Sequence, residues 1–222
     1  PAGAYEAAST RAMTRGPATG LADYSRSAGT ATIDIMVVYS NTVAEKQRPI
    51  DDAVRLWTME TTIASLRSKI PVTFRLVELV RLDMDEGEMD KDLEALIDPD
   101  DGRWDDIARI RDFVKADLVI AVGEYDRACG LAGGILPGPE RAFAMVSYPC
   151  AEAIYTFSHE IGHLMGGRHD LERDPSTFPF AHGHGFIAPD RSFRTLMSYP
   201  CGDGCDRIKA WSTPAVEEDG IV

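Results

Sequence analysis

Residues 159–170 read His-Glu-Ile-Gly-His-Leu-Met-Gly-Gly-Arg-His-Asp, which has the spacing His-Glu-x-x-His-x-x-Gly-x-x-His. The chain has five histidines, and three of them, His159, His163 and His169, fall inside this motif. Residues four apart lie on one face of an α-helix, so His159 and His163 can direct their rings at one metal ion. Gly166 can take a positive φ, end the helix and return His169 as a third ligand. The spacing therefore predicts a metal centre with three imidazole ligands.

The ligand count predicts catalysis. Three protein ligands leave a fourth position open on zinc, which is typical of a catalytic site and not of a structural one. Glu160 lies about 100° around the helix from His159, so it is placed to contact a water molecule and not to complete the ligand set. Zinc lowers the pKa of bound water from about 16 to about 7, and a nearby carboxylate can take the proton as the water attacks a carbonyl carbon. We expect one catalytic zinc ion, with Glu160 as the general base.

A second element, Thr195-Leu196-Met197-Ser198-Tyr199-Pro200, lies downstream. Together the two segments resemble the metzincin clan of zinc endopeptidases, in which the long zinc motif is coupled to a methionine turn beneath the metal. The resemblance implies that Met197 is the turn methionine. In astacins and serralysins of this clan, a tyrosine two residues later can bind the resting metal and then hydrogen-bond the transition state. Tyr199 has the matching position, and the alternative is a tyrosine that only packs against the site.

Flanking segments narrow the resemblance to reprolysin-like enzymes, and within them to bacterial peptidyl-Asp metalloendopeptidases. The segments are 32–39, 194–197 and 211–214, and Asp170 follows the third histidine as in reprolysin-like enzymes. The likeness runs loosely over 32–214, and only the zinc motif and the methionine turn are highly specific. Asp170 replaces the glutamate of astacins, so we expect it to anchor the turn by hydrogen bonds and not to act in catalysis.

Two arginines predict a preference for acidic substrates. In this clan the pocket just beyond the scissile bond lies between the zinc helix and the methionine turn, and Arg191 and Arg194 occupy the segment entering that turn. A guanidinium there would pair with a carboxylate through two hydrogen bonds, so we expect cleavage on the amino side of Asp, and secondarily of Glu. The alternative is that both arginines face solvent or form structural pairs. Gly133 and Gly134 are expected to let a substrate backbone approach an edge strand above the cleft.

The four cysteines, Cys129, Cys150, Cys201 and Cys205, allow three disulfide connectivities. The even count and the likeness to an extracellular protease favour two disulfides over four free thiols. We expect Cys129 to pair with Cys150, and Cys201 with Cys205, which would close a tight loop just after the methionine turn. A second zinc site is disfavoured because Cys201 and Cys205 lack a convincing partner pair.

Composition and charge limit the partners. The formal net charge of −13 argues against a nucleic-acid or anionic-membrane partner, because phosphate groups attract basic surfaces. No apolar run reaches the roughly 18 residues that cross a membrane. The sequence starts at Pro1, so we expect a processed, secreted, monomeric bacterial protein without its export signal, acting on proteins or peptides. The acidic stretch 83–106 predicts a solvated surface, with calcium binding as the weaker alternative. For His182 and His184, loop packing is favoured over a second metal site.

The hydrophobic periodicity predicts an α/β (α+β) fold with one peptidase domain over 32–222, preceded by a flexible arm or propeptide remnant at 1–31. We expect a twisted mixed sheet with helices in an upper lobe over about 32–166, and a small irregular lower lobe over about 167–222. In the first helix, Val54, Trp57, Ile63 and Leu66 are the expected core positions. The expected strands are 32–39, 72–82, 117–122 and 142–147, and the expected helices are 43–68, 104–115 and 151–165.

Three functional classes fit the sequence. The first is a secreted zinc endopeptidase. The second is a catalytically silent interaction module on the same scaffold, against which intact Glu160 argues, because an inactive relative can lose its base freely. The third is a zinc amidase with a non-peptide substrate, against which the expected edge strand and long cleft argue by analogy of fold.

Overall fold

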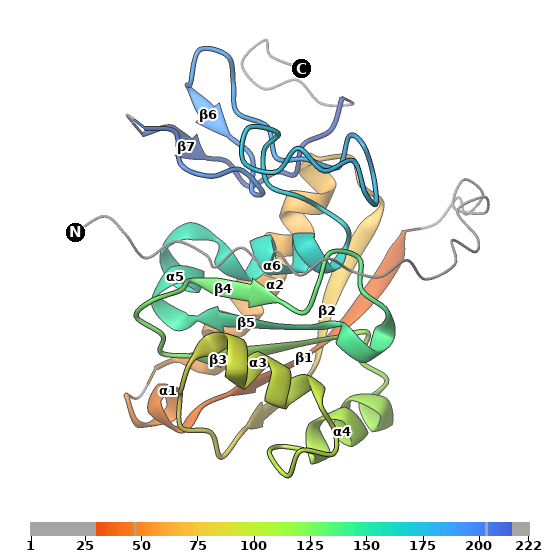
Figure 1. The fold of residues 1–222 in the computed structure, drawn as a ribbon, viewed down its shortest axis with the longest axis vertical. Coiled ribbons are helices and arrows are strands. Elements are labelled where there is room, and N and C mark those ends of the chain that lie inside the picture. Colours follow the sequence, from red (N-terminus) through yellow and green to blue (C-terminus); the bar gives the residue numbers. More distant parts are fainter. Residues whose placement is uncertain (1–29, 47, 203, 215–222) are drawn as a thin grey trace.

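The computed structural model describes residues 30–46, 48–202 and 204–214, and most of the arm expected at 1–31 lies outside these residues. Its centre is a five-stranded sheet of order β2-β1-β3-β5-β4 (Figure 1). Neighbouring strands are parallel except for β4, which is antiparallel to β5 and forms one edge. The strands are β1 (Ala31–Tyr39), β2 (Val72–Arg81), β3 (Leu118–Gly123), β4 (Gly130–Ala132) and β5 (Phe143–Ser147).

Alternate side chains of the central strands enter two separate cores, one on each face of the sheet. Ile35 and Val37 of β1 join Ile120 of β3 in the first core, whereas Met36 and Val38 point into the second. Successive side chains of a strand point to opposite faces, so a strand buried on both faces needs a continuous apolar run. This explains the apolar run at residues 35–38 of β1 and the unbroken apolar sequence of β3, and it confirms the expected α/β fold class.

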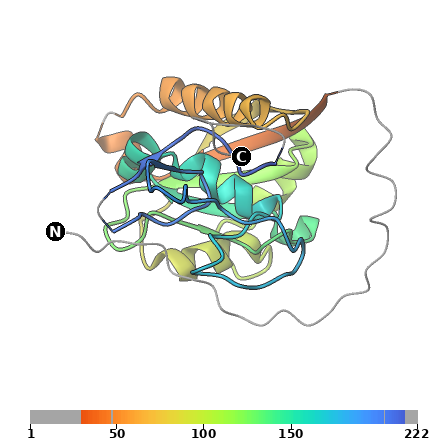
Figure 2. The ribbon, with the colours of Figure 1, turned by 90° about the horizontal axis from the view of Figure 1, so that it is seen from above.

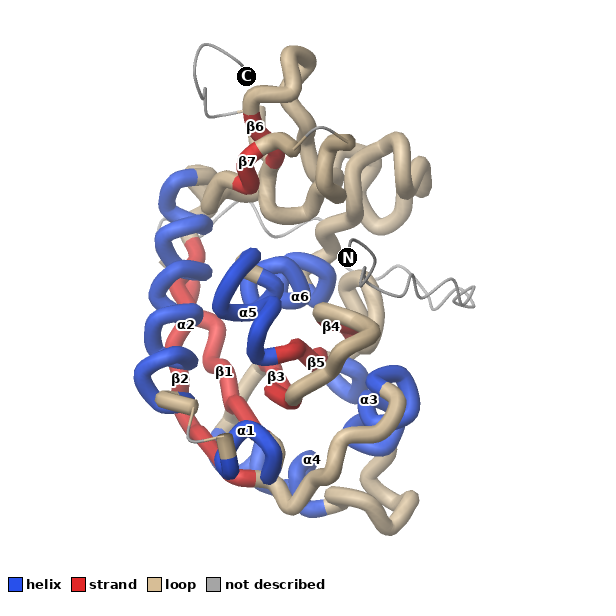
Figure 3. The backbone as a smooth tube through the Cα atoms, turned by 90° about the vertical axis from the view of Figure 1, so that its left-hand side faces the viewer, coloured by secondary structure: helices blue, strands red, loops and turns tan. Residues whose placement is uncertain are grey.

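Helices cover both faces of the sheet. α2 and α6 contribute to the first core, and α3 and α4 to the second; Figures 2 and 3 show α2 and α3 on opposite sides of the sheet. None of the helices in the described ranges is long and apolar enough to cross a bilayer. The helices are α1 (Asn41–Glu45), α2 (Ile50–Arg67), α3 (Met89–Ile97), α4 (Asp106–Val114), α5 (Tyr148–Ile154) and α6 (Thr156–Leu164), with a 3-10 turn, η1, at Pro139–Arg141.

The chain after α6 is mostly loop, as the tan tube at the top of Figure 3 shows. Its regular structure is one short parallel pair, β6 (Phe193–Arg194) and β7 (Asp206–Arg207). The expected strands before α6 are confirmed to within about one residue at each end. The edge strand β4 was expected above the cleft but without bounds, because it has only three residues. The helix α3 lies in the acidic stretch, where a solvated surface loop and helix were expected.

The first predicted helix was wrong in two respects. It is divided into α1 and α2, and Pro49 immediately precedes α2. Val54 and Trp57 are buried as expected, but Ile63 is 38% and Leu66 57% exposed. Ile63 and Leu66 lie outside the buried face of α2, which consists of Val54, Trp57, Thr58, Thr61, Ala64 and Ser65.

The acidic stretch is also not entirely solvated. Asp92 of α3 is 2% exposed and accepts hydrogen bonds from the Tyr125 hydroxyl at 3.0 Å and the Gly87 amide at 2.7 Å. Arg103 adds a charged hydrogen bond at 2.9 Å. Burial and the Asp92 carboxylate raise the pKa of the Tyr125 phenol, so the hydroxyl stays a donor. A buried carboxylate is tolerated here because several donors satisfy it.

The two cores predict that truncating a buried aliphatic side chain destabilises the fold far more than truncating an exposed one. Ile120→Ala removes a fully buried side chain from a central strand, and we expect it to lower the free energy of unfolding by about 2–5 kcal/mol. Leu66→Ala is the matched control on the exposed face of α2, with an expected effect of about 0.5 kcal/mol or less. Urea unfolding of the two variants and wild type measures the difference, and equal losses would contradict the assignment of the core.

Candidate metal centre

Helix α6 positions three side chains of the zinc motif. Tyr155 has a φ of 60°, which separates α5 from α6 and corrects the single helix expected over 151–165. One turn apart on α6, His159 is 0% and His163 8% exposed, and Glu160 between them is 1% exposed. The helix is held by Phe157, whose ring belongs to the first core. The side chains that carry the chemistry are therefore supported by packing on the sheet.

A glycine turn brings the third histidine back to the helix. α6 ends at Leu164, and Gly166 has a φ of 97°, the positive value that the sequence predicts. A Cβ atom at Gly166 would also lie 2.8 Å from the Phe180 ring, so a side chain is excluded by space as well as by backbone conformation. The turn is closed by the Gly167 amide, which donates to the Gly162 carbonyl at 2.7 Å.

The three imidazoles converge on one point. Nε2 of His169 lies 3.2 Å from Nε2 of His159 and 3.1 Å from Nε2 of His163. Tetrahedral zinc with Zn–N distances of about 2.0–2.1 Å keeps its nitrogen ligands about 3.4 Å apart. Within the described ranges, this is the one group of at least three His, Cys, Asp or Glu residues whose ligand atoms converge in this way. The donor set and its spacing fit a single zinc ion.

Hydrogen bonds at the far side of two rings define their tautomers. Nδ1 of His159 lies 2.6 Å from the Leu196 carbonyl oxygen, and Nδ1 of His163 lies 2.8 Å from the Gly167 carbonyl oxygen. A carbonyl oxygen can only accept, so each Nδ1 carries the proton and each Nε2 presents a lone pair. Both lone pairs are directed at the space shared with Nε2 of His169, where a cation bound by all three nitrogens would fit.

Glu160 stands against the edge strand β4. A Cβ atom at Gly130 would lie 2.7 Å from both Cγ and Cδ of Glu160, so the carboxylate occupies the space that a side chain at Gly130 would fill. Sequence analysis missed Gly130. A glycine inside a strand often marks a close approach, but the local sequence contains no indication that the approaching group is Glu160.

The methionine turn lies against the opposite side of α6. Met197 is 2% exposed, and a Cβ atom at Gly162 would lie 3.2 Å from its Cε atom and 2.9 Å from Nε1 of Trp211. Residues 160 and 162 differ by about 200° around the helix. The Glu160 side chain therefore leaves α6 on nearly the opposite side from the one that Met197 contacts at Gly162. The Leu196 carbonyl, in the residue before Met197, is the one that orients His159.

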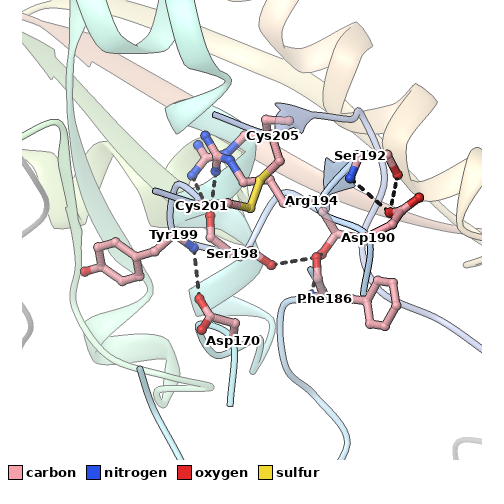
Figure 4. The surroundings of a disulfide bond; sticks show 11 residues. Asp170, Phe186, Asp190, Ser192, Arg194, Ser198, Tyr199, Cys201 and Cys205 are labelled. Carbon is pink, nitrogen blue, oxygen red and sulfur yellow. Dashed lines mark hydrogen bonds between the residues drawn. A yellow bond between two sulfur atoms is a disulfide. The ribbon is translucent and has the colours of Figure 1, made fainter. Parts of the chain in front are cut away.

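Asp170 joins the third histidine to the segment after the methionine turn (Figure 4). It is 5% exposed, and its Oδ2 accepts the Tyr199 amide at 3.0 Å. This hydrogen bond confirms the anchoring role expected for Asp170. The Tyr199 ring lies edge-on to the His169 ring, with 4.5 Å between the ring centroids. Tyr199 is thus adjacent to the metal ligands.

The two arginines expected to bind substrate have different surroundings. Arg194 is 7% exposed, and its Nη1 donates to the Ser198 carbonyl at 2.6 Å, so the guanidinium supports the methionine turn. Figure 4 shows it beside the Cys201–Cys205 disulfide. Arg191 is exposed in the turn between Ala188 and Phe193. The guanidinium of Arg194 therefore forms a structural hydrogen bond and is not exposed for a substrate carboxylate.

The glycines and the disulfides shape the rim of the site. Gly133 packs against its own sheet, where a Cβ atom would lie 3.0 Å from the Phe143 carbonyl oxygen, and Gly134 follows it in the loop after β4. The expected disulfide pairs are confirmed. The Cys129–Cys150 bond joins the residue before β4 to α5, and the Cys201–Cys205 bond closes the loop after the methionine turn.

The remaining histidines have unequal environments. His182 is exposed, whereas His184 is 6% exposed and its Nδ1 lies 2.9 Å from the His169 carbonyl oxygen. His184 therefore supports the returning segment through the backbone of His169, which agrees with loop packing. Sequence analysis could not identify this contact, because it joins two loops across 15 residues.

The chain is similar to known metallopeptidases. The profile of the reprolysin-like metallo-peptidase family M12B matches residues 55–170. A peptidyl-Asp metalloendopeptidase of Xanthomonas campestris pv. campestris is 37% identical over 193 residues, which cover 86% of this chain and 46% of the relative. One from Stenotrophomonas maltophilia is 36% identical over 201 residues, covering 88% and 48%. The chain thus spans about half the length of these curated relatives.

A solved structure described as a chaperone-substrate complex shares the fold. It aligns with a TM-score of 0.69 and 21% identity, over 86% of this chain and 34% of that one. The similarity concerns the fold alone.

The ligand geometry predicts a large loss of metal binding when one imidazole is removed. We expect His169→Ala to weaken zinc affinity by more than the roughly 10- to 100-fold that follows loss of an outer-shell partner. His182→Ala, at an exposed histidine outside the cluster, should leave the affinity unchanged. Competition titration against a chromophoric chelator measures both. Equal affinities for His169→Ala and wild type would exclude His169 from the ligand set.

Proposed function

The chain belongs to the reprolysin-like family M12B of metallopeptidases, and we propose that it is a zinc-dependent endopeptidase that cleaves on the amino side of aspartate. The observation that carries the proposal is the convergence of three Nε2 atoms, with the buried Glu160 next to the first of these histidines on the same helix. The relatives named peptidyl-Asp metalloendopeptidases support an aspartate at the cleavage site.

Zinc, when bound by His159, His163 and His169, supplies a Lewis acid that lowers the pKa of water and polarises a carbonyl group. Glu160 takes the proton of the attacking water and passes it to the leaving amine, so one carboxylate acts as base and then as acid. Its position against Gly130 supports this role, because the backbone of β4 limits the directions in which the carboxylate can turn.

Tyr199 is proposed to stabilise the transition state. Its ring lies 4.5 Å from that of His169, and its amide is fixed by Asp170 at 3.0 Å. A phenol held in this position can donate a hydrogen bond to the oxygen on which negative charge develops, which is a large source of rate enhancement in acyl transfer.

The substrate is proposed to bind as an extended strand along β4. This strand forms one edge of the sheet and pairs with β5 on its inner side. Peptides commonly add a strand to such an edge, with main-chain hydrogen bonds providing affinity. The Cys129–Cys150 disulfide adjoins β4 and supports an extracellular site of action, because disulfides persist in oxidising compartments.

Replacing Glu160 separates catalysis from metal binding. Glu160→Gln keeps the size of the side chain but cannot accept the proton, so we expect one zinc ion per chain and a loss of casein hydrolysis of about 10²–10⁴-fold or more. Zinc content is measured beside activity for the variant and wild type. Zinc binding by both proteins with no proteolysis by wild type would favour a silent module or an amidase over the proposed peptidase.

Removing the hydroxyl of Tyr199 tests its proposed role in the transition state. Tyr199→Phe keeps the ring against His169 and removes the hydrogen-bond donor, so we expect turnover to fall by about 10²-fold or more with zinc content unchanged. Steady-state kinetics on one peptide measures kcat and KM separately, and the loss should fall on kcat. Wild-type turnover in Tyr199→Phe would leave Tyr199 with a packing role only.

A further inference from the structure

Most arginines of the lower lobe are engaged in holding the fold. Arg168 pairs with Asp174 at 2.6 Å and also donates to the Phe178 carbonyl. Arg207 donates to the carbonyl of Ile154 at 2.7 Å and to that of Ser198 at 3.1 Å. With Arg194 also bound to Ser198, these guanidinium groups already have backbone or carboxylate partners. An acidic substrate side chain would have to displace those partners to bind any of them.

Arg173 differs because its contact is with an aromatic face. It is exposed, and its Cζ atom lies 5.5 Å from the centroid of the Tyr199 ring. That ring in turn lies 4.5 Å from the ring of the metal ligand His169. In the part of the chain that the structure describes, no carboxylate forms an ion pair with Arg173. A guanidinium placed over a ring keeps the N–H groups at its edge directed outward, where they can donate to a ligand.

The position of Arg173 is fixed by the residue that follows the third ligand. The Asp170 carbonyl accepts the amides of Arg173 and Asp174, each at 2.9 Å, while the Asp170 carboxylate accepts the amide of Tyr199. One buried residue thus sets the backbones of Arg173 and Tyr199 relative to His169. These hydrogen bonds hold the positive charge of Arg173 beside the candidate metal centre.

Arg191, the other exposed candidate, lies elsewhere. It is flanked by Asp190 and Ser192, which Figure 4 shows across the methionine-turn segment from Tyr199. Asp190 accepts hydrogen bonds from the Ser192 hydroxyl at 2.7 Å and from the Ser192 amide at 3.0 Å. Among the described residues, Arg191 has no aromatic contact that would hold its guanidinium beside His169, as the Tyr199 ring does for Arg173.

We propose that Arg173 and the face of Tyr199 form the subsite for the acidic side chain of the residue after the scissile bond, which rests on the proposed endopeptidase function. A planar guanidinium binds a carboxylate through two parallel hydrogen bonds, and a neutral amide of the same shape gains far less. The chain carries a net charge of −13, which opposes acidic peptides at long range. A preference for aspartate therefore requires a local cation, and Arg173 supplies it.

The test uses the zinc-loaded protein and two quenched fluorescent peptides that differ only in Asp or Asn after the cleaved bond. For Arg173→Ala, we expect kcat/KM on the Asp peptide to fall by about 10- to 100-fold, the range for a lost charged hydrogen bond, with little change on the Asn peptide. Arg173→Lys should recover part of the loss, because the charge returns without the planar fork. Arg173→Glu should disfavour the Asp peptide further.

Two controls test the assignment. Arg109→Ala removes an exposed arginine from α4, at the opposite end of the molecule from β6 and β7 (Figure 1), and should leave both peptides unaffected. Arg191→Ala tests the competing position. An Asp preference that survives in Arg173→Ala, or that disappears in Arg191→Ala instead, overturns the proposal. Thermal midpoint and zinc content, measured on every variant, separate these outcomes from a change in folding.

A binding measurement separates failure of the subsite from failure of the proposed function. Glu160→Gln, loaded with zinc, is titrated with the same two peptides, with and without Arg173→Ala. Tighter binding of the Asp peptide, lost in the double variant, supports the subsite even without turnover. Wild-type protein that cleaves neither peptide overturns the proposed function. Equal binding of the Asp and Asn peptides overturns the subsite, whatever the activity.

Discussion

Imidazole lone pairs directed at one point repel one another unless a cation lies between them, and much of the structure holds His159, His163 and His169 in that arrangement. Two of the three rings are oriented from behind by backbone carbonyl groups. The Leu196 carbonyl accepts from His159 and the Gly167 carbonyl from His163. The tautomers follow from these bonds, so the backbone beyond α6 decides which nitrogen faces the metal. The lower lobe, although irregular, is therefore part of the metal centre.

Several close approaches at this centre depend on missing side chains. Gly130 leaves room for Glu160, Gly162 admits Met197, and Gly166 both turns the chain and clears the Phe180 ring. Because residues 160 and 162 face nearly opposite directions on a helix, the edge strand and the methionine turn hold α6 from two sides. These two contacts hold α6, and with it the Glu160 carboxylate and the imidazoles of His159 and His163, between the edge strand and the methionine turn.

Sequence reasoning succeeded where periodicity and spacing are local. The apolar runs of β1 and β3 identify buried strands, and the zinc motif identifies a candidate set of ligands. It failed where packing decides. Ile63 and Leu66 have helical spacing but face outward, because the face of α2 that packs on the sheet is formed partly by small and polar residues such as Thr61, Ala64 and Ser65, which an apolar pattern does not identify. Tyr155 breaks a helix that nothing in the local sequence interrupts.

The sequence by itself determined which residues could carry the proposed chemistry, because histidines and a carboxylate at helical spacing indicate a ligand set and a base before any packing is known. Its apolar periods also indicated the fold class, whereas the four cysteines left three connectivities open, and the structure confirms the pairing that was expected. Only the tertiary structure decided which arginine lies where. Arg194 is buried on a carbonyl and Arg173 lies over an aromatic ring. These surroundings join segments distant in the chain, and long flexible side chains carry no periodic signal of where their charged ends lie.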